Sequence, residues 1–322
     1  MKIAFFGLSD ILKSALAWLD TKGLPYTVFV DNGQAAKSQL KVPAEKLTIL
    51  TGAPDDVGAE LWSQFDLGIS VGAPWRFSTS FVDGFKGKLL NLHGSQLPLY
   101  RGGNLFSWYA LNRVRTGVCL LHELNDQYDS GCIVKSEEFL YPSNCRKPVD
   151  YIRVYEEKNT AFLKGFVEQF VSGKAVFNAG IQPDYLSTYW PRLQANTNGW
   201  IDWSLDGDLI ERFICAFDDP YGGARTQVRG KEVVVRDVYF QPGFNHHPFQ
   251  NGIVFRKSKQ WLHVAVQGGE LIICSLESES KSIMQDLIST GDRLMTPTEK
   301  LDGSKRRVIK GKNGLSPQMD WE

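Results

Sequence analysis

The chain lacks a net charge, a cysteine framework and any long apolar run. Its 322 residues include 36 basic and 36 acidic side chains, so no overall field attracts nucleic acid or an anionic membrane. The five cysteines are scattered without a CxxC pair, which favours reduced thiols over disulfides or a zinc site. No stretch approaches the roughly 18 apolar residues of a membrane-spanning helix. The N-terminus is predicted to be a strand rather than a signal peptide. We therefore expect a cytoplasmic protein without a membrane partner.

Two glycine-rich phosphate-binding motifs are missing as well. A lone Gly7 follows the first predicted strand, and neither GxGxxG nor GxxxxGK[ST] occurs in the chain. Such loops bring backbone amides close to the phosphates of nucleotides. Their absence argues against a nicotinamide-dependent dehydrogenase.

The first half of the chain alternates apolar runs with helical patterns. This alternation predicts an α/β fold with a mostly parallel, Rossmann-like sheet and helices on both faces. The predicted strands are 2–6, 26–30, 47–50, 66–71, 88–92, 117–123 and 132–139, and the predicted helices are 11–21, 57–65, 79–85, 105–113 and 148–173.

The composition changes after residue 178, which suggests a second domain. We predict a catalytic domain over 1–178, a linker over 179–198, a second domain over 199–290 and a tail over 291–322. Within this tail, the basic stretch 303–322 is expected to be poorly ordered. A helix near 206–216 is followed by several short strands with frequent glycines, a pattern typical of a small β-barrel. These strands are 224–228, 232–238, 252–255, 262–265 and 270–273.

A polar pair, Asn91 and His93, stands at the end of the fifth predicted strand. Side chains alternate along a strand, so both point to one face. Ligands of open α/β sheets gather at the carboxyl ends of the strands. Pro98, Gly102 and Gly103 then predict an irregular loop next to His93. These residues predict a catalytic or binding site; the alternative is a structural pair of polar side chains in the core.

The stretch from Asn91 to Gly102 resembles the signature of the folate-dependent N-formyltransferases. This family includes methionyl-tRNA formyltransferase, glycinamide ribonucleotide transformylase and the nucleotide-sugar N-formyltransferases. Asp129 lies in an Asp-Ser-Gly turn where the family has Asp-Thr-Gly, at a similar spacing from His93. The resemblance covers most of residues 1–180. It continues into 201–203 and 219–224, which look like the start of the family's OB-like C-terminal barrel.

The resemblance implies a catalytic set of Asn91, His93 and Asp129. In the family the donor is N10-formyltetrahydrofolate, the acceptor is a primary amine, and no metal is expected. Attack on the formyl carbon places negative charge on the formyl oxygen, which Asn91 and His93 would stabilise. The attacking nitrogen must also lose a proton. Either His93 or Asp129 would act as the base, with Asp129 otherwise orienting the imidazole.

The resemblance also places the folate next to two segments at the same edge of the sheet. In the family, backbone groups of these segments pair with the pterin ring. The residues expected to bind the cofactor are Gly72, Ala73, Pro74, Trp75, Asn125, Asp126 and Tyr128. Trp75 is alternatively an aromatic residue of the core.

The expected acceptor is an amino sugar carried on a nucleotide, used in cell-surface glycan biosynthesis. Methionyl-tRNA formyltransferases have a basic loop after the second strand, whereas residues 31–38 are nearly uncharged here. The run from Arg101 to Trp108 is more similar to the glycan-modifying enzymes. Aromatic rings for stacking and a guanidinium for phosphate make Tyr100, Arg101, Trp108 and Tyr221 candidate contacts, although each is alternatively structural.

Three other functions stay open at this point. The basic residues of the tail favour a methionyl-tRNA formyltransferase. However, such tails are commonly only solvated, and nucleic acid is not the expected partner. A hydrolase that releases formate from the folate would need no amine pocket. A binding protein without activity is disfavoured by the intact catalytic set. The resemblance is also compatible with a homodimer.

Overall fold

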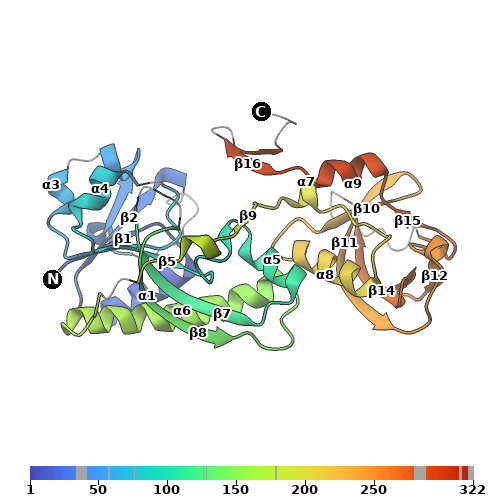
Figure 1. Ribbon diagram of the computed structural model, residues 1–322, viewed down its shortest axis with the longest axis horizontal. Coiled ribbons are helices and arrows are strands. Elements are labelled where there is room, and N and C mark those ends of the chain that lie inside the picture. The colour runs from blue at the N-terminus through green and yellow to red at the C-terminus, as the bar shows by residue number, and fades with distance from the viewer. Residues whose placement is uncertain are drawn as a thin grey trace. The chain divides into compact units, whose positions relative to one another are not determined.

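The computed structural model describes most of the chain and divides it into two compact units (Figure 1). Unit 1 contains residues 1–101, 116–140 and 153–189, and unit 2 contains residues 102–115, 141–152 and 190–322. The described residues are 1–33, 42–56, 59–75, 77–125, 127, 129–177, 180–278, 288–311 and 314–317.

Unit 1 is built on a seven-stranded sheet in the order β3-β2-β1-β4-β5-β7-β8. The first five strands of this order are parallel, whereas β7 and β8 are antiparallel to their neighbours. The strands are β1 (Ile3–Phe6), β2 (Tyr26–Asp31), β3 (Leu47–Leu50), β4 (Leu67–Ser70), β5 (Leu89–His93), β7 (Thr116–Glu123) and β8 (Ile133–Leu140). The helices are α1 (Asp10–Thr21), η1 (Ala44–Lys46), η2 (Pro54–Asp56), α3 (Ala59–Trp62), α4 (Thr79–Gly84), η3 (Asp184–Leu186) and α6 (Pro148–Val171), whose first turn belongs to unit 2.

Apolar side chains on alternate positions of the strands create a core on each face of this sheet. Phe5 contributes to the core that packs against α1 and α6, whereas Phe6 contributes to the core that packs against α3 and α4. The second core is mainly aromatic. Phe6 contacts the rings of Phe29, Trp62, Phe77, Phe81 and Phe85 at centroid distances of 5.2 to 5.9 Å.

Unit 2 contains a six-stranded antiparallel sheet in the order β12-β13-β14-β11-β10-β15. A bridge between Ile253 and Arg293 joins the two ends of this sheet, so the strands enclose a barrel-like core. Its strands are β10 (Ala224–Val228), β11 (Lys231–Pro242), β12 (Val254–Lys257), β13 (Leu262–Val266), β14 (Gly269–Glu277) and β15 (Leu294–Met295). Its helices are α5 (Leu105–Asn112), α7 (Ala195–Asn198), α8 (Gly207–Phe217), η4 (Pro248–Gln250) and α9 (Thr298–Ser304). Two short pairs complete the structure: β6 (Arg101–Gly102) with β9 (Tyr189–Trp190), and β16 (Val308–Gly311) with β17 (Gly314–Pro317).

The predicted fold class is confirmed: a mostly parallel α/β sheet is followed by an antiparallel barrel-like sheet. The predicted helix at 57–65 ends too late, since α3 (Ala59–Trp62) ends at Trp62, and residues 57 and 58 lie outside the described residues. Residues 294–295, which we placed in the tail, pair with β10 in the sheet of unit 2, where Leu294 is fully buried. The segments 102–115 and 141–152 group with the C-terminal residues, whereas we predicted them in the first domain.

None of the helices in the described part of the chain is long and apolar enough to cross a membrane.

Replacing Phe6 by Ala should lower the stability of unit 1 by about 3–5 kcal/mol, because the ring is fully buried among five aromatic partners. Urea unfolding followed by hydrogen exchange of peptides from β1, with peptides from β11 as the internal reference, measures this loss. Phe244→Ala is the control, since that side chain is 76% exposed and its loss should change stability by less than about 0.5 kcal/mol. Equal effects of the two substitutions would contradict the role of this aromatic core.

Candidate active site

Strand β5 ends with two polar side chains on one face of the sheet. Asn91 and His93 alternate with Leu90 and Leu92, which are buried in the core against α1 and α6. The opposite face therefore receives the amide and the imidazole side by side. His93 is the last residue of the strand, so the pair lies at the carboxyl end of β5, where α/β sheets bind ligands.

Strand β7 places a second histidine opposite this pair. β7 runs antiparallel to β5 in a register that sets His122 across from Asn91. His122 Nδ1 lies 2.8 Å from the carbonyl oxygen of Glu123, and His122 Nε2 lies 3.2 Å from Asn91 Nδ2. A carbonyl oxygen can only accept, so Nδ1 carries the hydrogen and Nε2 accepts from the amide. The buried ring thereby fixes the orientation of Asn91.

Asp129 approaches the same face from the loop that follows β7. Its backbone has a φ of +53°, and the side-chain amide of Gln182 donates to the carbonyl oxygens of Asp129 and Gly131 at 2.9 and 2.7 Å. A Cβ atom at Gly131 would collide with the carbonyl oxygen of Glu123, so only glycine fits there. The Asp-Ser-Gly sequence and Gln182 together determine where the carboxylate lies.

The three polar side chains converge at short distances. His93 Nδ1 lies 3.5 Å from Asp129 Oδ1, and His122 Nε2 lies 3.9 Å from the same oxygen. His93 Nε2 lies 2.6 Å from the hydroxyl oxygen of Ser95. The carboxylate favours a hydrogen on His93 Nδ1, so His93 Nε2 accepts from the Ser95 hydroxyl. The contact between His93 and Asp129 is longer than an ordinary hydrogen bond and is mainly electrostatic.

Burial lowers the pKa of both imidazoles. For His93, desolvation outweighs the charge of Asp129, which acts to raise the pKa. The pKa of His122 falls to about 4, because burial and the nearby His93 disfavour its protonated form. The hydrogen bond to Glu123 opposes this shift only in part. Both rings are therefore neutral near pH 7, and His93 is able to accept a proton.

A cavity of about 300 Å³ opens next to these residues. It combines aromatic and small apolar groups with the polar side chains described above. The lining residues are Ser70, Gly72, Ala73, Trp75, Phe77, Asn91, Leu92, His93, Leu124, Asn125, Gln127 and Asp129. The volume lies at the lower end of the range typical of small-molecule sites.

The cavity brings together several of the residues predicted to bind a cofactor. Gly72, Ala73, Trp75 and Asn125 line it, whereas Pro74 is not among the lining residues. Two further predicted residues, Asp126 and Tyr128, lie outside the described residues.

The four predicted acceptor contacts do not line this cavity. Tyr100 donates its backbone N–H to the Thr188 hydroxyl at 3.2 Å. Arg101 donates to Asp184 at 2.8 Å and to Gln182 at 3.0 Å. Trp108 and Tyr221 belong to unit 2, where Trp108 Nε1 donates to the carbonyl oxygen of Pro191 at 3.0 Å. The role of all four residues toward an acceptor stays a prediction.

Sequence reasoning missed His122 and Ser95, which contact the predicted catalytic residues Asn91 and His93. The available signal for His122 was a polar residue next to the apolar run 118–121 of a buried strand. Its pairing with Asn91 depends on a register that the sequence does not display. Ser95 follows His93 by two residues and was visible only as part of the motif.

The same side chains also have the composition of a metal site. Ligand atoms of His93, His122 and Asp129 all lie within 4.8 Å of one another. However, His122 Nε2 already accepts from Asn91 and His93 Nε2 is bonded to Ser95, so a metal would compete with these hydrogen bonds. The expectation of no metal stays a prediction.

Comparison with known proteins places this site in a family. The model for "Formyl transferase" matches residues 64–140, and that for "Formyl transferase, C-terminal domain" matches residues 195–288. The methionyl-tRNA formyltransferase of Mycoplasma genitalium is 30% identical over 230 residues, which are 68% of this chain and 69% of that protein. The chain belongs to the formyl transferase family. Alignments with three other curated family members span 60 to 66% of the lengths of those proteins.

Solved structures of formyl transferases share the fold. A sugar 3N-formyl transferase, WlaRD, determined in the presence of dTDP and 5-N-formyl-THF, has a TM-score of 0.65 and 17% identity, covering 85% of this chain and 97% of that one. The N-formyltransferase of Helicobacter canadensis, in complex with folinic acid and dTDP-3-aminofucose, has a TM-score of 0.62 and 17% identity, covering 85% and 99%. At this identity the likeness concerns the fold.

Replacing His122 by Phe should lower the kcat for formyl transfer about tenfold, because the Asn91 amide loses the acceptor that orients it. The substitution keeps a buried ring of similar size. A double-mutant cycle with Asn91→Ala measures whether the effect passes through Asn91. In the Asn91→Ala background His122→Phe should have little further effect, and an undiminished second loss would contradict the positioning role.

Proposed function

We propose that this protein transfers a formyl group from N10-formyltetrahydrofolate to the primary amine of a nucleotide-linked amino sugar. The observation that carries the proposal is the convergence of Asn91, His93 and Asp129 on the wall of one cavity. An amide donor, a neutral imidazole and a carboxylate are the groups that amine formylation needs.

Asn91 is suited to stabilise charge on the formyl oxygen. One hydrogen of its amide is donated to His122, which leaves the second for the oxygen on which negative charge develops. Because His122 is buried and neutral, it accepts this bond without adding a positive charge of its own. The donor is therefore held in place before the reaction, which avoids the cost of orienting it.

His93 is the best candidate to accept the proton of the attacking amine. Its pKa is lowered by burial, so the ring is unprotonated near neutral pH. Asp129 lies 3.5 Å from Nδ1 and would stabilise the imidazolium that forms. The Ser95 hydroxyl, 2.6 Å from Nε2, offers a route for the proton to and from the ring. In this assignment Asp129 orients and stabilises, and His93 is the base.

The remaining lining residues fit the ring of a reduced folate. Trp75, Phe77 and Leu124 supply flat or apolar surface, and Gly72 and Ala73 expose backbone groups because they carry little or no side chain. Bound there, the folate would supply the activated formyl group. Gly7 allows the segment that contains Gly72 and Ala73 to lie close to the end of β1, since a Cβ atom at position 7 would collide with the backbone of Ala73.

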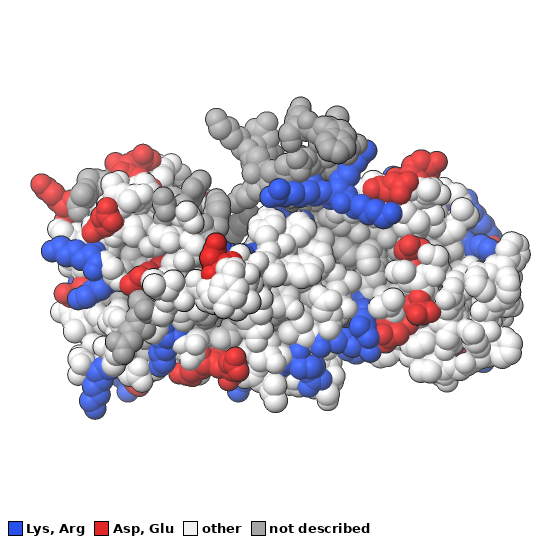
Figure 2. Space-filling view, in the orientation of Figure 1, with Lys and Arg blue, Asp and Glu red and all other residues white. Residues whose placement is uncertain are grey.

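Two observations support a nucleotide-linked amino sugar as the acceptor: the ligands of related solved structures and the distribution of charge on the surface. The solved sugar formyltransferases that share the fold are described with dTDP or with a dTDP amino sugar. On the face shown in Figure 2, small groups of basic and of acidic side chains are scattered over a mainly uncharged surface, whereas tRNA binding favours a continuous basic surface. Methionyl-tRNA formyltransferases among the sequence relatives make charged tRNA the second candidate acceptor.

Incubation with N10-formyltetrahydrofolate and a panel of dTDP-linked amino sugars should yield an N-formylated sugar and tetrahydrofolate, detected by mass spectrometry. Asn91→Ala, His93→Ala and Asp129→Ala should each lower the rate by about 10²- to 10⁴-fold, because each removes a group that acts on the reacting atoms. Circular dichroism should show that all three variants retain the fold.

Asp66→Asn is the matched control, because this half-exposed carboxylate precedes β4, at the edge opposite the site. It should keep near-normal activity. If a parallel incubation with methionyl-tRNA yields formylated methionyl-tRNA and no sugar is formylated, the acceptor is tRNA and not a sugar. Release of formate without any formylated product would indicate a hydrolase. Near-normal rates in all three alanine variants would contradict the proposed catalytic set.

The imidazole of His93 should titrate below the ordinary value of 6.5, because burial lowers its pKa. Asp129→Asn removes the negative charge that raises this pKa, so the titration should move to still lower pH. NMR titration of isotope-labelled histidine measures both values, and the chain has only five histidines to assign. Asp66→Asn should leave the midpoint unchanged. A higher midpoint in Asp129→Asn would refute the electrostatic contact.

A further inference from the structure

Unit 2 contains a second cavity, of about 410 Å³, that the proposed reaction does not use. Its lining contains four arginines from three separate segments. Arg113 and Arg115 follow α5, Arg146 precedes α6, and Arg212 lies on α8. Sequence reasoning attached no function to this cluster, because the four residues are far apart in the chain.

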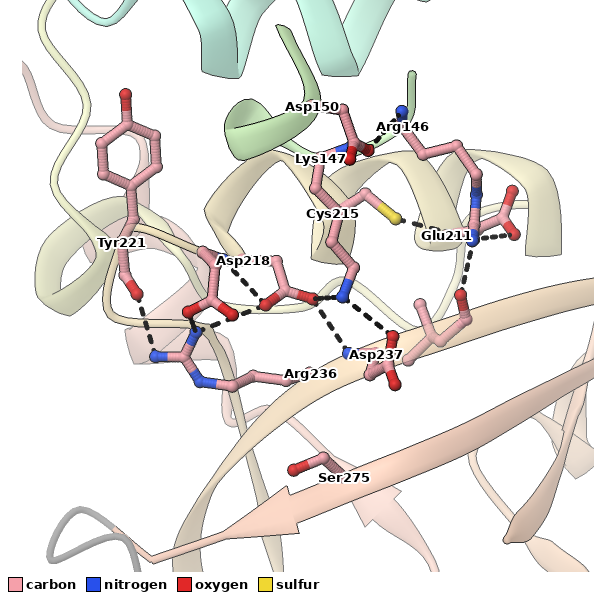
Figure 3. Close-up of polar contacts among 12 residues, drawn as sticks. Arg146, Lys147, Asp150, Glu211, Cys215, Asp218, Tyr221, Arg236, Asp237 and Ser275 are labelled. Carbon is pink, nitrogen blue, oxygen red and sulfur yellow. Dashed lines mark hydrogen bonds and ion pairs between the residues drawn. The ribbon is translucent and has the colours of Figure 1, made fainter. Parts of the chain in front are cut away.

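The carboxylates nearby balance only part of this positive charge. Glu211, the acidic residue of the lining, lies 3.0 Å from Arg113. It also lies 2.6 Å from Arg146, as Figure 3 shows. Asp208, one turn earlier on α8, pairs with Arg113 and Arg212. Three of the four guanidinium groups thus share two carboxylates through ion pairs, and the fourth, that of Arg115, has no carboxylate partner among the described residues. The adjacent Lys147 does not change this balance, because its ammonium pairs with Asp218 and Asp237.

Two of the arginines have donors to spare. Arg115 donates to the carbonyl oxygen of Tyr141 at 2.6 Å, and no carboxylate among the described residues pairs with it. Arg212 Nε is buried and has no acceptor in the described part of the chain. Arg212 also lines the cavity, and its ion-pair partner Asp208 is shared with Arg113. The Ser143 hydroxyl lines the same cavity and offers a further donor.

We propose that this cavity binds a phosphate-bearing small anion, with Arg115 and Arg212 as its principal ligands. A phosphomonoester carries a charge of about −1.5 to −2 near pH 7, which matches the two unbalanced guanidinium charges better than a single carboxylate does. The forked donors of arginine match phosphate oxygens. The free ion and the phosphoryl end of a nucleotide share this chemistry, and the cavity holds either.

Isothermal titration of the full-length protein with inorganic phosphate, pyrophosphate and a nucleoside monophosphate tests the proposal. At least one of these ligands should bind, and the strongest ligand distinguishes a free phosphate from a phosphoryl group on an organic molecule. Acetate is the charge control and should bind at least tenfold more weakly. No binding by any phosphate ligand, or equal binding of acetate, would overturn the proposal.

Two substitutions connect binding to the cavity. Arg115→Gln removes an unbalanced charge, and Arg212→Lys keeps a cation near Asp208 but removes the forked donors of the guanidinium. Each should weaken phosphate binding about tenfold or more, the usual effect of losing a charged hydrogen bond. Arg229→Gln is the matched control, since this arginine pairs with Asp292 and is not part of the lining. Unchanged affinity in both cavity variants, or an equal loss in the control, would refute the assignment.

Discussion

The hydrogen bond between Asn91 and His122 is the contact on which the geometry of the site depends. It joins two strands that run in opposite directions, and it forms only in the register that sets these residues opposite each other. A shift of one residue would turn His122 toward the core and bring Leu121 to the amide. The bond also orients the amide, because the ring offers an acceptor on that side alone. The pairing of β5 with β7 thereby orients the side-chain amide of Asn91 as a hydrogen-bond donor.

Burial gives the site its electrostatic character. The same desolvation that makes His122 a permanent acceptor leaves His93 unprotonated near neutral pH. Asp129 partly offsets this effect for His93, so the ring can take up a proton without a prohibitive cost. The two imidazoles therefore differ in role although both lie on the same face. His122 keeps its hydrogen bonds, whereas His93 lies between the charge of the Asp129 carboxylate and the Ser95 hydroxyl, with which it shares a hydrogen bond.

Much of this architecture could be predicted from local patterns. The alternation of apolar runs with helical patterns in the first half of the chain indicated a mostly parallel sheet, and period-two alternation placed Asn91 and His93 on one face. The short strands of unit 2 indicated its antiparallel sheet. In contrast, the division into units could not be read from composition, because residues 102–115 and 141–152 pack with a domain that is distant in sequence. The burial of Leu294 could not be predicted from local patterns either, because it depends on pairing with β10.

The sequence by itself determined the elements, the family resemblance and the identity of the three central polar residues, because spacing and motif are local properties of the chain. Only the tertiary structure decided that His122 supports Asn91, that Gln182 holds the turn of Asp129, and that four distant arginines surround one cavity. Each of these depends on which segments pack together and in which register. That choice follows from the burial of apolar surface across the whole chain, which no local pattern records.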